Sequence, residues 1–102
     1  MAEEVEIRWS RKAIQQIKKI GEYIELDSPW QAERVVKKLY AVPERLSWSP
    51  TKGRIVPEYR DPNLREVSVL SWRVIYRLKR SNLVEIVAVV HGKRILRESM
   101  LD

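Results

Sequence analysis

Residues 64–92, LREVSVLSWRVIYRLKRSNLVEIVAVVHG, contain three successive runs of strand type. The runs cover residues 64–70, 72–79 and 83–91. Arg80-Ser81-Asn82 supplies turn-forming residues between the second run and the third. Strands that are joined by short turns are typical of an antiparallel meander. The uninterrupted apolar stretch 86–90 predicts a central strand that is covered on both faces.

The N-terminal half is expected to add one strand and a pair of helices. Residues 4–9 alternate between charged and apolar side chains, which is the period of a half-buried strand. That strand must join the sheet, because an isolated strand cannot bury its apolar face. Apolar residues at helical spacing follow Ser10 and predict a helix that ends at Asp27-Ser28-Pro29. The same residues open a second helix, which Pro43 is expected to kink or end.

The remaining segments are expected to be largely irregular. The prolines and the glycine of residues 48–63 predict a loop with little regular structure. The tail, residues 93–102, either adds one short helix or remains extended. The predicted order is β-α-α-β-β-β, an α+β fold in which a helical hairpin packs on one face of an antiparallel sheet. A chain of 102 residues is expected to form a single domain over residues 1–102.

Composition excludes several classes of protein. The chain has no Cys and one His, which rules out a disulfide scaffold, a thiol nucleophile and a Cys-ligated metal site and argues against a His-rich one. No Gly-rich phosphate loop or other cofactor motif is present, so neither a metal nor a cofactor is expected. The N-terminus lacks the apolar core of a signal peptide, and no apolar run approaches the ~20 residues that cross a bilayer. We therefore expect a cytoplasmic protein that does not enter a membrane.

The charge is unevenly distributed along the chain. Residues 52–102 carry eleven basic and six acidic side chains, whereas residues 1–51 carry nine and eight. This excess indicates an anionic partner, although a basic surface that serves only solubility is the alternative. Arginine forks bind phosphate oxygens, and one face of the sheet could gather several of them. The cationic candidates are Lys52, Arg54, Arg60, Arg65, Arg73, Arg77 and Arg94.

Single residues in this set have competing interpretations. Arg73 and Arg77 share a strand face by parity, but Arg73 could instead pair with a sheet neighbour such as Glu66. His91, at the end of the last strand, is either a packed or solvent-facing histidine or a proton donor and phosphate contact beside Arg94. Among the aromatic residues, Trp9, Trp72 and Tyr76 are expected in the core. Trp30 and Trp48 are expected equally in helix packing or in an interface.

The order of several segments resembles that of the RelE/ParE toxin superfamily, the toxic halves of bacterial type II toxin–antitoxin modules, often named plasmid stabilisation proteins. The segments are IRWSRKAIQQIKKIGEYI, SPTKGRIVPEY, LREVSV, WRVIYRL and VEIVAVVHGKR. The likeness spans residues 5–94, and HGKR after an apolar strand is its most specific part. In this superfamily, RelE-type toxins cleave mRNA in the ribosomal A site, and ParE-type toxins poison DNA gyrase.

The resemblance to RelE implies a site of lysines, arginines and a C-terminal tyrosine, of which this chain keeps only part. Arg65 stands where the first sheet lysine would be, Arg73 matches the strand arginine, and Arg94 matches the arginine of GKR. Val67 and Met100 stand where a second lysine and the tyrosine would be. Neither can accept the proton of the attacking 2′-hydroxyl, which leaves His91 as the substitute base.

These departures favour the ParE-like branch, as do the HGKR ending and the loop that contains Gly53-Arg54 and Pro57-Glu58. We expect a growth-inhibiting toxin that binds DNA gyrase and performs no chemistry of its own. One alternative is a metal-independent, ribosome-dependent mRNA endonuclease with Arg65, Arg73, His91 and Arg94 as catalytic residues. The other is a basic RNA- or protein-binding module. The implied partner is an acidic, partly disordered cognate antitoxin that forms a hetero-oligomer with the toxin.

Overall fold

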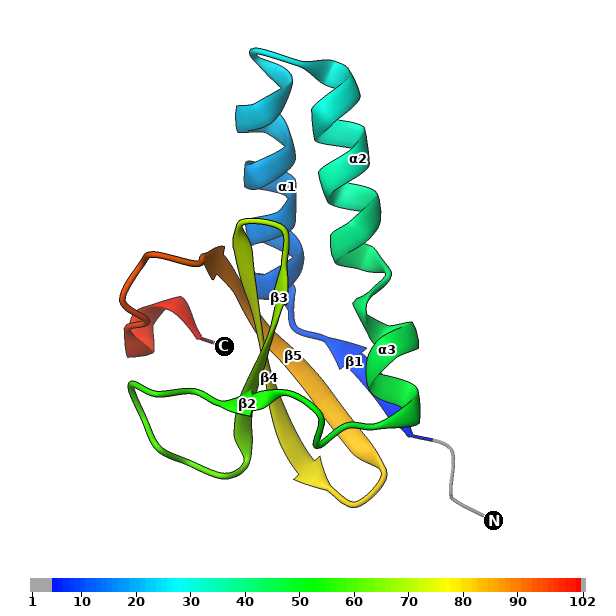
Figure 1. Ribbon diagram of the computed structural model, residues 1–102, viewed down its shortest axis with the longest axis vertical. Helices are drawn as coiled ribbons and strands as arrows, with labels where there is room; N and C mark the ends of the chain where they lie inside the picture. Colours follow the sequence, from blue (N-terminus) through cyan, green and yellow to red (C-terminus); the bar gives the residue numbers. More distant parts are fainter. Residues whose placement is uncertain (1–4, 102) are drawn as a thin grey trace.

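The sheet contains five strands, one more than the sequence predicts, in the order β1-β5-β4-β3-β2. The computed structural model describes residues 5–101, so Glu4 and Asp102, the ends of the predicted first strand and tail, lie outside it. The elements are β1 (Glu6–Trp9), α1 (Arg11–Glu25), α2 (Pro29–Tyr40), α3 (Val42–Trp48), β2 (Arg54–Ile55), β3 (Leu64–Val69), β4 (Trp72–Arg80), β5 (Leu83–His91) and a 3₁₀ turn at Glu98–Met100. The α+β class and the helical hairpin are confirmed (Figure 1).

The prediction of a purely antiparallel sheet is wrong, because the sheet is mixed. The pairs β2–β3, β3–β4 and β4–β5 are antiparallel, but β1 runs parallel to β5, with Ile7 opposite Val84. The alternation of apolar and polar side chains specifies which face of a strand is buried. This alternation is the same whether the strand pairs in parallel or antiparallel, so it does not predict the direction of pairing. The chain between β1 and the other strands of the sheet runs through the helices. No tight turn therefore fixes the direction of β1, whereas tight turns fix the directions of β3, β4 and β5.

The segment 48–63 has little regular structure, as predicted, apart from the end of α3 and the two-residue edge strand β2. Of the two outcomes expected at Pro43, a kink or a helix end, the structure shows the helix end, and α3 follows as a separate helix. Pro43 lies in the first turn of α3 and α2 has already ended at Tyr40, because proline lacks the N–H that a continuing helix would need.

Side-chain caps define where the hairpin helices begin. Ser10 Oγ accepts a hydrogen bond from Ala13 N at 3.0 Å, and Ser28 Oγ accepts one from Gln31 N at 3.2 Å. The two helices approach closely at Gly21, where an added Cβ would lie 2.9 Å from Val36 Cγ2. The hairpin extends well beyond the sheet, so the turn between α1 and α2 lies at one end of the molecule (Figure 1).

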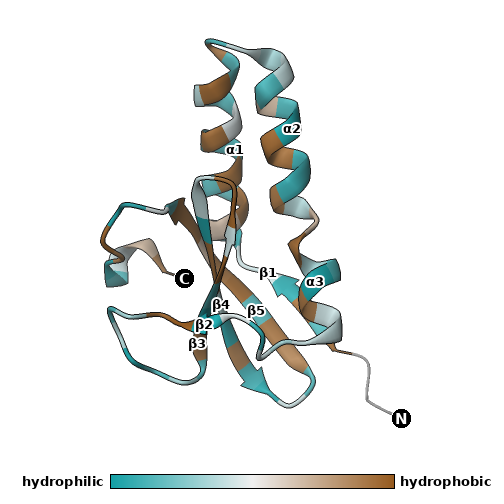
Figure 2. Cartoon of the chain, in the orientation of Figure 1, coloured by the Kyte–Doolittle hydropathy of each residue, from teal (hydrophilic) through white to brown (hydrophobic). Residues whose placement is uncertain are grey.

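Both faces of the sheet are covered, but by different parts of the chain. The helices pack on one face over a cluster that includes Val67, Val74, Tyr76 and Ile86. The second face carries a smaller cluster, closed by Leu96 of the C-terminal tail; its buried members are Val56, Leu64, Ile75, Val87, Ala88, Val90 and Leu96. The prediction that β5 is a central, doubly covered strand is therefore confirmed, and Figure 2 shows its apolar colouring along most of its length.

The aromatic residues divide as the sequence suggests. Tyr76 is fully buried, and Trp9 and Trp72 pack partly buried against the first cluster. Trp30 and Trp48 are 70% and 90% exposed, which favours the interface alternative for both. No helix within residues 5–101 is both long and apolar enough to cross a lipid bilayer.

Candidate functional site

Arg73 lies at the centre of a buried ion-pair network on the second face of the sheet. Its side chain is 7% exposed and forms two hydrogen bonds of 2.8 Å to Glu58, from Nη1 to Oε2 and from Nη2 to Oε1. Arg73 Nε and Nη2 also bind Glu66 Oε1, and Nη1 donates to the backbone oxygen of Arg94 at 3.0 Å. Arg54 Nε completes the network at 2.8 Å from Glu66 Oε2. The alternative interpretation of Arg73, an ion pair with Glu66, is confirmed.

The network shifts the pKa values of two of its own side chains. The hydrogen bonds from Arg73 lower the pKa of Glu58 from 4.5 to about 2, and the backbone N–H of Leu96, 2.7 Å from Glu58 Oε2, acts in the same direction. The hydrogen bonds to Glu58, with further contributions from Glu66, raise the pKa of Arg73. Glu58 is therefore ionised at neutral pH, and the charge of Arg73 is already compensated by carboxylates before any ligand arrives.

Arg65 points to the opposite face of the sheet. Its cross-strand neighbour is Tyr76 in the helix-side cluster, whereas Arg73 is opposite Ser68 and Arg77 is opposite Leu64 on the other face. The prediction that Arg73 and Arg77 share a face is thus confirmed. Arg65 donates to three backbone oxygens, those of Pro62, Thr51 and Gly53, at 2.9, 3.1 and 3.2 Å. It tethers the loop before β2.

That loop is also held by Tyr76. The phenol oxygen of Tyr76 donates to Pro50 O at 2.7 Å and accepts from Gly53 N at 2.9 Å. A Cβ on Gly53 would lie 2.3 Å from this oxygen, so only glycine permits the approach. Burial raises the pKa of Tyr76. Tyr76 and Arg65 together therefore fix the loop structurally.

His91 and Arg94 do lie together, in a shallow groove of about 260 Å³ between α1, the end of β5 and the tail. Lys19 and Met100 also line this groove. The ring of His91 meets Trp72 edge-on, with centroids 6.1 Å apart, and its Nδ1 accepts from Lys93 N at 3.2 Å. In the neutral ring, Nε2 therefore carries the proton. Met100, at the position that the resemblance assigns to a tyrosine, supplies no acid or base here.

The tail that forms this groove is anchored to α1 by two hydrogen bonds. Lys12 Nζ donates to Ser99 O at 2.7 Å, and Gln16 Nε2 donates to Met100 O at 3.0 Å. Gln16 Oε1 also accepts from Val89 N at 2.7 Å, on the part of β5 that β1 does not reach. Gln16, Lys19 and Glu58 contribute to these contacts and were not predicted from the sequence. Their signal is weak, because each is one polar residue in a helix or loop.

The structure thus separates the predicted site residues into three environments. Arg73 is buried and paired, Arg65 holds a loop on the other face, and His91 and Arg94 line an exposed groove with Lys19. A phosphate could meet the groove cations directly, but it would reach Arg73 only by displacing a carboxylate. The groove can therefore bind an anionic or hydrogen-bonding surface of a partner through its exposed side chains.

Comparison with known proteins places this fold. The family described as "ParE toxin of type II toxin-antitoxin system, parDE" matches residues 7–96. The chain belongs to the ParE toxin family. This ParE-family chain is also 34% identical over 88 residues to the toxin candidate Y4kP of Sinorhizobium fredii (strain NBRC 101917 / NGR234). The aligned region covers 84% of this chain and 86% of Y4kP. It is therefore a toxin of a type II toxin–antitoxin system, and its family implies an antitoxin partner.

Solved structures share the fold of this ParE-family toxin. A chain of the chromosomal ParDE system from P. aeruginosa superposes with a TM-score of 0.71 at 20% identity, covering 87% of this chain and 97% of that one. A free-state mutant of the E. coli toxin RelE superposes with a TM-score of 0.59 at 15% identity, covering 89% and 86%. The family match over residues 7–96, together with this shared fold, confirms the predicted membership of the RelE/ParE superfamily.

The lowered pKa of Glu58 predicts an acid-sensitive fold. A carboxylate whose pKa is depressed in the folded state stabilises the fold above its unfolded pKa, and this contribution is lost as pH falls toward the folded value. Stability should therefore decline as pH falls from about 4.5 toward about 2. Denaturant unfolding of Glu58→Gln across this range should show a flatter profile. Glu22→Gln, on the exposed side of α1, controls for the lost charge, and equal slopes in both variants would contradict the prediction.

Proposed function

We propose that this toxin inhibits DNA gyrase by binding it and catalyses no reaction itself. The observation that carries the proposal is the state of Arg73, the residue that would contact the scissile phosphate in mRNA cleavage. Its side chain is 7% exposed and is bound by the carboxylates of Glu58 and Glu66. Val67 and Met100 offer no proton acceptor, and among residues 5–101 the side chains that line the groove include one imidazole, that of His91, and no carboxylate.

The second candidate is ribosome-dependent mRNA cleavage, and the groove is what favours it. His91, Arg94 and Lys19 line one exposed surface, where a cationic shell and a base could act on a single phosphodiester. Arg65 and Arg73 would then act only by holding the loop and the tail in place. A third candidate, a basic RNA- or protein-binding module, is favoured only by the net positive charge.

The antitoxin is proposed to be an acidic, partly disordered segment that folds across the C-terminal half. Residues 52–97 carry eleven basic and four acidic side chains. Arg94 and Arg97 are exposed, as are Lys52 and Lys93. A segment of this kind would bind rapidly and with strong salt dependence, because its charges oppose those of the toxin. Calorimetry at low and high salt tests this electrostatic contribution, and an affinity that salt does not change would contradict it.

Two assays with the same protein test the choice of target. Gyrase supercoiling should be inhibited, while messages translated in vitro should remain intact when their ends are mapped by primer extension. Arg94→Ala should weaken gyrase inhibition about tenfold or more without lowering the melting temperature, because an exposed arginine in an interface acts through its contacts. Arg80→Ala, an exposed arginine at the far end of β4, is the matched control.

The opposite outcomes distinguish the candidates. Codon-dependent cuts that disappear in His91→Ala would make the protein a ribonuclease with His91 as its base. Cuts that persist in His91→Ala would also reject the gyrase proposal and would show that the groove cations suffice. Full gyrase inhibition by Arg94→Ala would remove this groove from the interface.

A further inference from the structure

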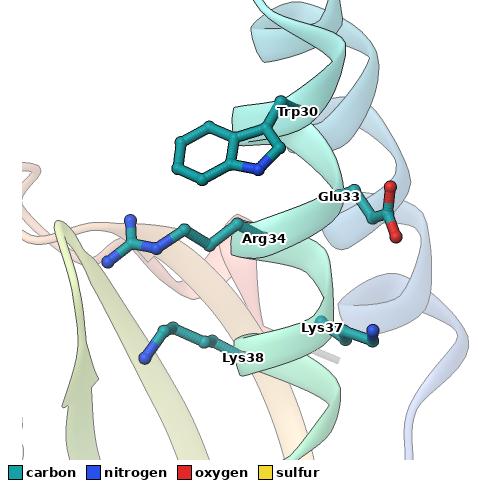
Figure 3. Close-up of a pocket in the computed structure, with 5 residues that line it drawn as sticks. All are labelled: Trp30, Glu33, Arg34, Lys37 and Lys38. Carbon is teal, nitrogen blue, oxygen red and sulfur yellow. The ribbon is translucent and has the colours of Figure 1, made fainter.

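The outer surface of α2 carries a tryptophan and two cations in one row. Trp30, Arg34 and Lys38 follow one another at intervals of four residues, so they lie on the same side of the helix. Figure 3 shows these three side chains projecting together, while Glu33 and Lys37 project to the other side of α2. We call Trp30, Arg34 and Lys38 the α2 stripe. It borders a concave surface of about 320 Å³ that shares no lining residue with the groove at His91.

The cations of the α2 stripe are not neutralised within the fold. Among residues 5–101, no carboxylate lies within ion-pair distance of Arg34 or Lys38. Arg34 has one long hydrogen bond, 3.5 Å to the side chain of Gln31. Arg73 differs in this respect, since two carboxylates bind it. The stripe therefore presents positive charge that is available to a ligand.

Trp30 has no packing role that explains its position. Its side chain is 70% exposed, and the residues of α2 that bury against α1 and the sheet are Ala32, Val35 and Leu39, on the other side of the helix. A large aromatic surface that is left in water beside cations is typical of a recognition surface. The indole offers a flat face for stacking, and Arg34 offers a fork for anions one helical turn away.

The cationic track continues past the end of α2. Lys38 also borders a second concave surface of about 300 Å³, which lies between α2, α3 and the β3–β4 turn. Arg45 lines that surface and donates from Nη1 to Ser68 O at 3.4 Å. Positive side chains thus follow one another from Arg34 through Lys38 to Arg45. A polyanion bound over Trp30 could extend along this row.

We propose that the α2 stripe binds single-stranded nucleic acid, with one base stacked on Trp30 and the phosphates on Arg34 and Lys38. An amphipathic helix would need several apolar anchors at helical spacing, and among the residues that the structure describes Trp30 is the one apolar residue that lines the first concave surface. A single strand needs only a stacking surface and a row of cations. A duplex fits less well, because its bases are already stacked inside the helix. The inference goes beyond the proposed function and holds for either target.

Fluorescence anisotropy of the full chain with labelled oligonucleotides tests this site. Short oligothymidine, oligouridine and a DNA duplex of mixed sequence are titrated at low salt. Either single strand should bind more tightly than the duplex, and the stronger of the two identifies DNA or RNA as the ligand. Trp30→Ala should weaken that binding about tenfold, as expected for the loss of one stacked base. Arg34→Glu with Lys38→Glu should weaken it further and reduce the dependence of log K on log salt by about 0.7 per cation.

Matched variants separate this site from general charge. Trp48→Ala removes an even more exposed indole at the end of α3, and Lys18→Glu with Arg80→Glu makes the same change in net charge elsewhere. Both controls should bind oligonucleotides much more tightly than the stripe variants. Equal losses in stripe and control variants would overturn the proposal, as would duplex binding that matches single-strand binding. Binding of polyglutamate but of neither oligonucleotide would also overturn it and would assign the stripe to an acidic protein.

Discussion

Replacing Arg73 with alanine is expected to lower the free energy of unfolding by about 3–5 kcal/mol, the usual result of breaking a buried ion pair from one side. The Glu66 side chain is 1% exposed and would keep only Arg54 as its partner. Glu58 would lose both of its hydrogen bonds from Arg73, and Arg94 O would lose its donor. Urea unfolding monitored by tryptophan fluorescence measures the change.

Arg77→Ala is the matched control for this prediction, because Arg77 lies on the same face of the same strand. Its side chain is 33% exposed and reaches Asp61 only at 4.0 Å, so its removal should change stability by about 0–1 kcal/mol. Removing Glu58 and Glu66 together with Arg73 should restore part of the loss, since no unpaired buried charge would remain. Equal stability of Arg73→Ala and the native chain would show that the network contributes nothing to the fold.

This prediction changes how a loss of toxicity should be interpreted. A non-toxic Arg73→Ala variant would be a destabilised protein, because the same side chain holds the loop at Glu58, the strand at Glu66 and the tail at Arg94. Arg94→Ala is the more informative variant. The side chain of Arg94 is exposed, whereas only its backbone oxygen takes part in the network.

The sequence contained enough information for most of the fold. The strands β3, β4 and β5 follow from the alternation and apolar runs of residues 64–92, and the helix starts follow from Ser10 and Ser28. The strand β2 has only two residues, which is too short to show the alternation that predicts a strand. The parallel pairing of β1 with β5 depends on the packing of the helices, which alternation does not encode.

The candidate site was harder to predict, since it depends on register and on loops. Arg65 is spaced by two residues from the buried Val67, as Val67 is from Val69, so all three share one face of β3, and their side relative to Arg73 follows once the two-residue turn between β3 and β4 is known. The ion pair between Arg73 and Glu58 joins a strand to a loop fifteen residues earlier in the sequence. No local sequence pattern predicts such a contact. The grouping of Arg94 with His91 was predictable because His91 ends β5 and Arg94 follows it by three residues.

Leu96→Ala should also have a large effect, about 2–5 kcal/mol, as for other leucines removed from a packed core. Leu96 is 3% exposed and closes the second cluster, while its backbone N–H donates to Glu58 Oε2 at 2.7 Å. Loss of its side chain should leave a cavity in the second cluster and weaken the attachment of the tail. The neighbouring Ile95 is 70% exposed, so Ile95→Ala should leave the unfolding free energy almost unchanged.

The functional consequence of this pair of variants follows from where the tail runs. Between His91 and Met100 it forms one wall of the groove that contains Arg94, so a loosened tail should weaken target inhibition even at temperatures where the protein remains folded. Inhibition of supercoiling by Leu96→Ala should therefore fall at a temperature below its own melting point, whereas Ile95→Ala should inhibit as the native chain does. Native inhibition by a folded Leu96→Ala would show that the groove does not need the tail in its anchored position. A loss in Ile95→Ala at unchanged stability would instead make that exposed isoleucine a direct contact with the target.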